Sequence, residues 1–167
     1  MKKFSLIIGV SILLMIVGCS AKSNQNYIAK QINITIPDTL SIEQTDDHGG
    51  FHGDGKRFAK IEFDKKNSLK VLSQIEKGGR WKKMPLTENL NLIMYGGVKN
   101  NIEYGYKLAK EFGIPEIKNG YWCFIDRHSD STNTESDTEI FDRYSFNFTI
   151  SMYDAENNTL YYCEFDT

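Results

Sequence analysis

The strongest constraint on the fold is the strand pattern in the last thirty residues. Apolar side chains alternate with polar ones from Phe146 to Met152, residues 154–158 are typical of a turn, and apolar residues return over 160–165. Alternation with a period of two indicates a strand, and two such runs joined by a short polar segment predict a β-hairpin. We therefore expect the chain to end in a β-hairpin.

The upstream sequence predicts further strands and at most two helices. The expected strands are 27–37, 40–44, 57–63, 114–117 and 121–125, the last two joined by the Asn119-Gly120 turn. A helix is expected over 64–77, capped by Asp64 or Asn67, and a weaker one over 102–112, whereas 86–95 fits either state. Residues 129–138 are polar enough for an exposed loop. These elements predict an α+β fold: a small antiparallel sheet with one or two helices.

The N-terminal segment has the composition of an export signal. Lys2 and Lys3 form a basic start, residues 4–18 are uncharged, and Cys19 follows at once. The apolar run over 6–17 is shorter than the roughly 20 residues that a membrane-spanning helix needs. A cleaved or anchoring leader therefore fits better than a membrane span.

The end of this leader, Ile16-Val17-Gly18-Cys19, resembles the lipobox of bacterial lipoprotein precursors. The resemblance covers only the leader. It implies that diacylglycerol is attached to the Cys19 sulfur and that the chain is cut before Cys19. Several acyl chains give stable anchoring where one alone is marginal. An ordinary secretory signal or an uncleaved anchor is the alternative. The expected location is the extracytoplasmic face of the cell membrane.

Removal of the signal peptide, residues 1–18, leaves 149 of the 167 residues. We expect 19–26 to be a flexible tether and 27–167 to form a single domain. The mature part carries 18 Lys and Arg against 22 Asp and Glu, formally −4. An acidic domain of this kind does not favour nucleic acid as a partner, since phosphate binding needs a basic face. The membrane, through the lipid anchor, is the expected partner together with an envelope protein, peptide or glycan.

The glycine-rich segment 46–56 contains two of the three histidines. His48, His52 and Asp54 are candidate ligands for a divalent metal, because imidazole and carboxylate are ligands that zinc uses. The same residues also fit a turn whose side chains bond the local backbone. Gly50 to Lys56 resembles a P-loop, but Arg57 replaces the required hydroxyl and no helix is expected to follow. We expect no cofactor other than this possible metal.

Two further groups of residues have an ordinary and a functional interpretation. Residues 126–130 place His128 beside Asp and Ser, yet no nucleophile-elbow motif is present, so a charged strand end is the simpler interpretation. Cys123 and Cys163 either pair, as extracellular cysteines can, or remain thiols. If the strand containing Phe148 lies between theirs, the two sulfurs are too far apart to bond.

Aromatic residues are concentrated in the C-terminal part of the chain and include Tyr121, Trp122, Phe124, Tyr144, Phe146, Phe148, Tyr153, Tyr161, Tyr162 and Phe165. They predict either core packing and cross-strand pairs or an aromatic platform for a glycan or peptide. We expect no catalytic residues, and a binding or interaction module rather than an enzyme. A small metal-binding protein or metal-dependent hydrolase using His48 and His52 is the alternative. An immunity or inhibitor lipoprotein fits the size and location equally well.

Overall fold

A computed structural model describes residues 24–49 and 53–167. The chain divides into two compact units, Met1–Ile36 and Pro37–Thr167. In the first unit a helix covers 24–31, which includes the last three residues of the expected tether. The strand expected over 27–37 is therefore wrong. Ile28 and Ile32, both buried, are four residues apart, the spacing that brings them onto one helical face.

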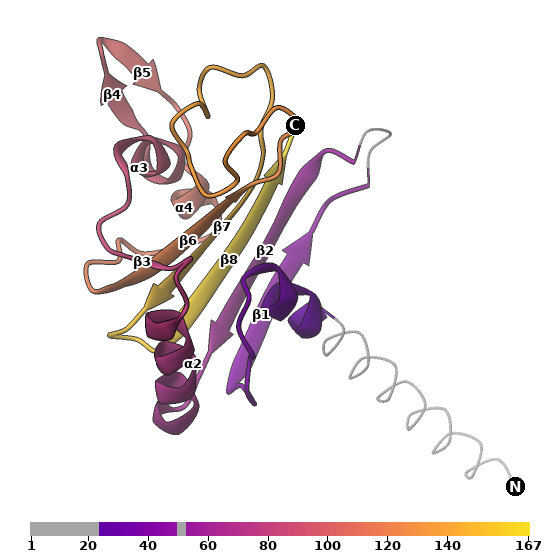
Figure 1. Cartoon of the computed structure of the whole chain (residues 1–167), viewed down its shortest axis with the longest axis vertical. Coiled ribbons are helices and arrows are strands. Elements are labelled where there is room, and N and C mark those ends of the chain that lie inside the picture. The colour runs from indigo at the N-terminus through magenta and orange to yellow at the C-terminus, as the bar shows by residue number, and fades with distance from the viewer. Residues whose placement is uncertain (1–23, 50–52) are drawn as a thin grey trace, which may run out of the picture. The chain divides into compact units, whose positions relative to one another are not determined.

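The second unit is built on a six-stranded antiparallel sheet, with strand order β1-β2-β8-β7-β6-β3 (Figure 1). The strands are β1 (Ser41–Asp46), β2 (Gly55–Glu62), β3 (Lys82–Lys83), β6 (Gly120–Asp126), β7 (Asn147–Asp154) and β8 (Thr159–Asp166). A separate two-stranded sheet pairs β4 (Gly97–Lys99) with β5 (Ile102–Tyr104). The α+β class and the C-terminal hairpin β7–β8 are confirmed.

Three helices belong to this unit: α2 (Lys65–Lys77), α3 (Glu88–Tyr95) and α4 (Leu108–Glu111). Helix α2 begins as expected, because the Asp64 carboxylate accepts a hydrogen bond from the Asn67 backbone N–H. The helix expected over 102–112 is wrong. Its first part forms strand β5 and only the four residues of α4 are helical.

The hairpin expected over 114–125 is also wrong in its first half. Residues 114–117 form no strand, and β6 pairs instead with β3 and β7. Asn119-Gly120 still lies at the start of the strand, where a side chain on Gly120 would collide with the Tyr153 backbone oxygen. The glycine therefore serves the close approach of β6 to β7 rather than a turn between neighbouring strands.

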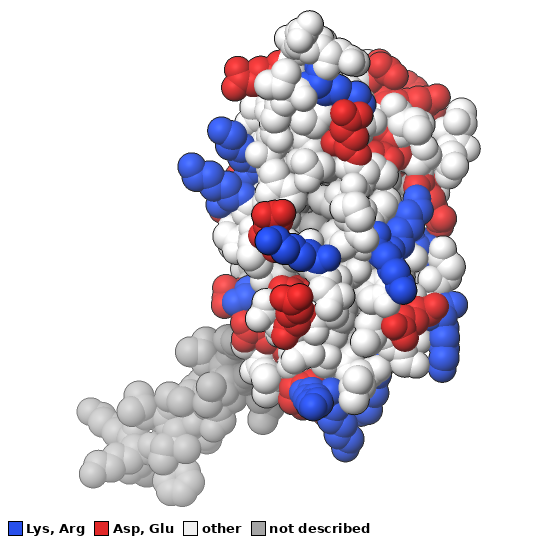
Figure 2. All heavy atoms as spheres, turned by 90° about the vertical axis from the view of Figure 1, so that its left-hand side faces the viewer, with Lys and Arg blue, Asp and Glu red and all other residues white. Residues whose placement is uncertain are grey.

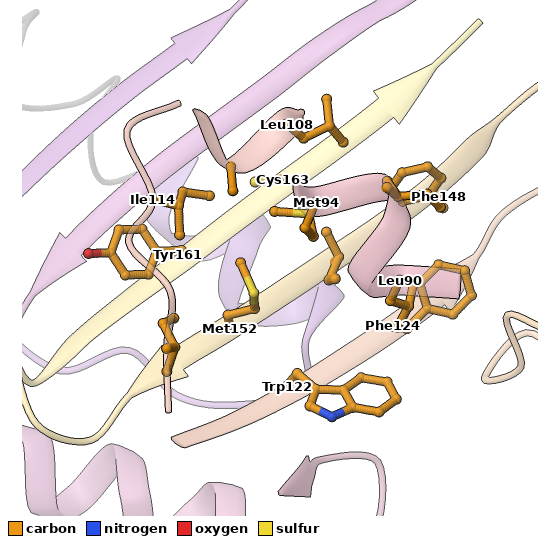
Figure 3. Packing of buried hydrophobic residues seen from close by; sticks show 14 of the residues in the cluster. Leu90, Met94, Leu108, Ile114, Trp122, Phe124, Phe148, Met152, Tyr161 and Cys163 are labelled. Carbon is orange, nitrogen blue, oxygen red and sulfur yellow. The ribbon is translucent and has the colours of Figure 1, made fainter. Parts of the chain in front are cut away.

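The main core lies on the sheet face that α3 and α4 cover (Figure 3). Leu90 and Met94 of α3 and Leu108 of α4 pack with the buried side chains of the central strands, which include Trp122, Phe124, Phe148, Ile150, Met152, Tyr161 and Cys163. On the opposite face α2 packs through Ser68, Val71 and Ile75, and the Ser68 hydroxyl lies 2.6 Å from the Tyr153 hydroxyl. The central strands β6, β7 and β8 are thus buried from both sides, whereas β1 is largely exposed.

Among the described residues, no helix is long and apolar enough to cross a membrane.

Candidate functional site

The His48 cluster lies where β1, β2 and β8 meet at one end of the sheet. His48 Nδ1 lies 2.7 Å from Asp46 Oδ1, and His48 Nε2 lies 3.0 Å from Asp166 Oδ2. Arg57 donates to Asp46, and Arg127 pairs with Asp166 at 2.8 Å. Because each ring nitrogen faces a carboxylate, the doubly protonated imidazolium satisfies the site best.

The charges of this cluster favour the ionised forms of His48 and Asp46. Partial burial lowers the pKa of His48, but hydrogen bonds to Asp46 and Asp166 outweigh that effect and raise it above its ordinary value. Partial burial likewise raises the pKa of Asp46, but hydrogen bonds from His48 and Arg57 bring it below its ordinary value. The cluster therefore links the β1–β2 connection to the last strand, β8, through ion pairs.

Two of the three predicted metal ligands, His48 and Asp54, belong to the described residues. A metal at His48 would require one ring nitrogen to leave its carboxylate, since metal binding uses the ring lone pair. Asp54 is exposed, and His52 lies outside the described residues. Over 24–49 and 53–167, no group of three or more His, Cys, Asp or Glu side chains is arranged to hold a metal ion. The three-residue set with His52 stays a prediction.

The second predicted cluster, residues 126–130, is structural. His128 is buried, its Nδ1 accepts a hydrogen bond from the Asp130 backbone N–H, and its Nε2 lies 3.2 Å from the Ser145 hydroxyl. The Ser129 hydroxyl donates to Asp130 and not to His128. The neighbouring serine and histidine therefore do not form the nucleophile–base pair of a hydrolase.

The two cysteines are free thiols on opposite faces of the sheet. Cys163 packs in the main core, whereas Cys123 pairs across the strands with Ser151, on the face that carries Tyr153. Strand β7 lies between β6 and β8, as the thiol alternative required. Burial raises the pKa of Cys123 to about 12 and raises that of Cys163 further. The disulfide alternative is wrong, and neither thiol is activated for chemistry.

An open cleft of about 410 Å³ lies beside the β4–β5 hairpin. We call it the aromatic cleft. It is lined by Tyr104, Tyr106, Phe141, Arg143, Tyr144, Phe146, Phe165 and Thr167. These residues come from the hairpin, from the segment between β6 and β7, and from the end of β8. Three parts of the chain that are distant in sequence therefore meet at one surface.

The walls of the aromatic cleft are held by ring–ring contacts. The Tyr104 and Phe141 ring centroids are 4.4 Å apart, Phe146 stacks on Phe165 at 5.6 Å, and Tyr106 meets Phe146 edge to face. Phe146 and Phe165 also contact Phe148 of the core. One wall of the cleft is thus a continuation of the packed core.

Arg143 is the one charged side chain among the residues that line the aromatic cleft. Arg143 pairs with both Asp126 and Glu139, so its positive charge is balanced within the protein. Residues 126–143 contain six Asp or Glu against two Arg, a formal charge of −4 with histidine neutral. The segment that supplies Phe141 and Arg143 to the cleft is therefore acidic.

Apolar side chains are exposed beside the aromatic cleft. In the described residues, seven large hydrophobic side chains are exposed; Tyr106 and Tyr144 line this cleft, and Ile102 lies on the same face of the β4–β5 hairpin as Tyr104. Tyr144 is 88% exposed. Exposed apolar groups gathered in one place mark interaction surfaces, whereas scattered ones do not.

Sequence reasoning identified part of this cleft. Tyr144, Phe146 and Phe165 belong to the predicted aromatic group, whereas most of the other members of that group are buried. Tyr104, Tyr106 and Phe141 were missed, because the segment around the first two was expected to be helical. Two asparagines at 100 and 101, both with positive φ, were the available signal for a tight hairpin there.

No protein-family model, curated protein or solved structure matches this chain. The function is therefore argued from the geometry of the cleft and from the sequence of the leader.

Proposed function

We propose that the protein is a lipid-anchored extracytoplasmic binding module that holds a cationic peptide segment of a partner protein in the aromatic cleft. The observation that carries the proposal is the combination of an exposed tyrosine-rich cleft with an acidic segment, 126–143, that supplies part of its lining. Aromatic faces attract Lys and Arg side chains, and the carboxylates of that segment add to that attraction. Tyrosine is also among the residues that contribute most binding energy at protein interfaces.

A protein partner is favoured over a small ligand by the size of the exposed apolar surface. Ile102, on the hairpin face that carries Tyr104, extends this surface beyond Tyr106 and Tyr144. A compact ligand in a cleft of about 410 Å³ would leave Ile102 uncovered. A peptide segment that fills the cleft and crosses the hairpin would cover all three side chains.

The test measures the fluorescence anisotropy of two labelled probe peptides of equal length. One alternates Lys with Trp, and the other alternates Glu with Trp. We expect the purified full chain to bind the lysine probe and not the glutamate probe. Loss of an interface aromatic typically costs about 2 kcal/mol, so Tyr144→Ala should weaken binding by roughly 30-fold.

Leu40→Ala is the matched control, because Leu40 is 69% exposed and does not line the aromatic cleft. It should bind the lysine probe as the parent does. Equal weakening by Leu40→Ala and Tyr144→Ala, or binding of a neutral oligosaccharide in place of both peptides, would reject the proposal. The second result would redirect it to a glycan.

The anchor is proposed from the leader, since the lipobox Ile16-Val17-Gly18-Cys19 supplies the lipid-accepting thiol. In a bacterial host the mature protein should partition into the detergent phase of a phase-separating detergent. Mass spectrometry should find the acyl groups on Cys19. Cys19→Ala should leave an unlipidated and unprocessed chain. Detection of a processed, unmodified N-terminus in the parent would mean an ordinary secretory signal.

A further inference from the structure

We propose that α2 and the adjoining strand β3 form a membrane-facing surface that binds anionic lipid headgroups, an inference that rests on the proposed lipid anchor. The basic face, as we call it, comprises Lys65, Lys66, Lys70, Lys77 and Lys83, whereas Lys82 lies over the Trp122 ring on the other face of the sheet. Residues 64–83 contain seven Lys or Arg against two Asp or Glu, formally +5. The rest of the mature chain therefore carries −9. Positive charge is therefore concentrated in this segment, although the mature protein as a whole is acidic.

The lysines of the basic face are not neutralised by the protein. Within 24–49 and 53–167, none of the five has a carboxylate oxygen within 4 Å, although thirteen such ion pairs occur elsewhere. Lys70 donates to the uncharged Asn67 side chain at 2.9 Å. The two acidic residues of the segment are already bonded. Asp64 caps α2, and Glu76 accepts a hydrogen bond from the Tyr121 hydroxyl at 2.8 Å. Neither neutralises the lysines.

The outward stripe of α2 also presents one apolar side chain. Lys66, Leu69, Lys70 and Lys77 follow helical spacing on the side away from the buried Val71 and Ile75. Leu69 is 59% exposed among these lysines. An exposed leucine flanked by lysines suits the interface of an anionic bilayer, since the leucine can enter the headgroup region while the lysines contact phosphates.

The sheet edge beside α2 continues the basic face. Lys83 lines two neighbouring clefts, of about 300 Å³ and about 140 Å³, and Lys118 lines the second. Tyr121 lines both. Tyrosine and lysine together are typical of residues at a membrane–water boundary. In Figure 2, Lys and Arg side chains project from the lower end of the view, where α2 lies in Figure 1.

This surface has a consequence for the aromatic cleft. Within the second unit, α2 lies at the opposite end from the loop that joins β6 to β7 (Figure 1). That loop supplies Phe141, Arg143 and Tyr144 of the cleft. Contact of α2 with the bilayer would direct the cleft away from the membrane, toward a partner arriving from outside.

The test places an environment-sensitive fluorophore on Leu69→Cys or, as matched control, on Val98→Cys, which is 68% exposed in β4. Every full-length variant also carries Cys19→Ser, and the thiols of Cys123 and Cys163 are buried. In vesicles with 30% phosphatidylglycerol we expect a blue shift at position 69 and quenching by brominated lipid, with neither at position 98. In vesicles of pure phosphatidylcholine, both labels should show the emission of a fluorophore in water. No blue shift at 69, or equal shifts in neutral vesicles, overturns the proposal.

Charge variants separate the lipid surface from a soluble polyanion. Each lysine near an anionic membrane raises the partition coefficient about five-fold. Lys66→Gln, Lys70→Gln and Lys77→Gln together should therefore lower the partition coefficient, measured from the response at position 69, by about 100-fold. The matched triple Lys99→Gln, Lys107→Gln and Lys110→Gln should leave it unchanged. Binding of soluble polyphosphate without a vesicle response would overturn the membrane assignment. Peptide binding in the absence of vesicles, and detection of the lipid on Cys19, test the proposed function separately.

Discussion

At the scale of single residues, His48 joins the β1–β2 connection to the last strand through Asp46 and Asp166. His48 was a candidate metal ligand because histidine and aspartate lie close in sequence. Its second partner, Asp166, is 118 residues away. A contact of that separation depends on β8 lying beside β2, which residue types alone do not predict. Cys123 and Cys163 were more predictable, because a strand between theirs was enough to keep them apart.

The His48 cluster predicts a pH dependence of stability. The pKa of His48 lies above its ordinary value of 6.5, so the stabilisation is fully present below pH 6.5 and is lost as the pH rises through the raised value. We expect His48→Gln to lower the melting temperature by about 2–4 °C at pH 5.5, with little difference from the parent at pH 9. Melting curves across this pH range measure it.

The Asp166→Asn variant supplies the control for this prediction. In the Asp166→Asn background, the pH-dependent part of the melting-temperature loss caused by His48→Gln should be smaller, because one of the two carboxylates beside the imidazolium is gone. The stability lost with the Arg127–Asp166 ion pair should be the same at every pH. A His48→Gln effect that grows toward high pH would show that the sign is wrong and that neutral His48 is the stabilising form.

At the scale of helices and strands, the sequence predicted β1, β2, α2, β7 and β8 but not the segment between α2 and β6. Helix α2 has a capping aspartate and an apolar stripe, and β7 has strict alternation, so local pattern and tertiary packing agree. Residues 97–111 contain a three-residue strand pair and a four-residue helix. Such short elements are set by packing against neighbours, and their periodicity is too brief to detect.

The cap of α2 gives a prediction at this scale. Asp64→Ala removes the acceptor of the Asn67 backbone N–H and should lower the free energy of unfolding by about 1 kcal/mol. Denaturant unfolding measures it, with Asp54→Ala as a control, because Asp54 is exposed and lies outside any helix. Equal stability of the parent and Asp64→Ala would mean that packing of Val71 and Ile75 alone determines where the helix begins.

At the scale of the whole molecule, composition indicated an acidic protein but not how its charges are arranged. The formal charge of −4 in the mature part combines a segment of +5 with a remainder of −9. The sequence alone does not show that the basic segment forms one outer surface of α2 and β3, or that the acidic segment 126–143 borders a cleft. The two segments also meet, because Arg80 pairs with Glu135 at 3.1 Å and the Lys82 ammonium donates to the Glu135 backbone oxygen.

The most direct test of the central claim maps the binding surface by NMR. Backbone amide shifts of the isotope-labelled full chain are followed during titration with the unlabelled Lys-Trp probe peptide. The largest changes should occur around Tyr104, Tyr106, Phe141 and Tyr144, and they should disappear in Tyr144→Ala. Changes centred on α2, or spread evenly over the sheet, would contradict a binding site in the aromatic cleft.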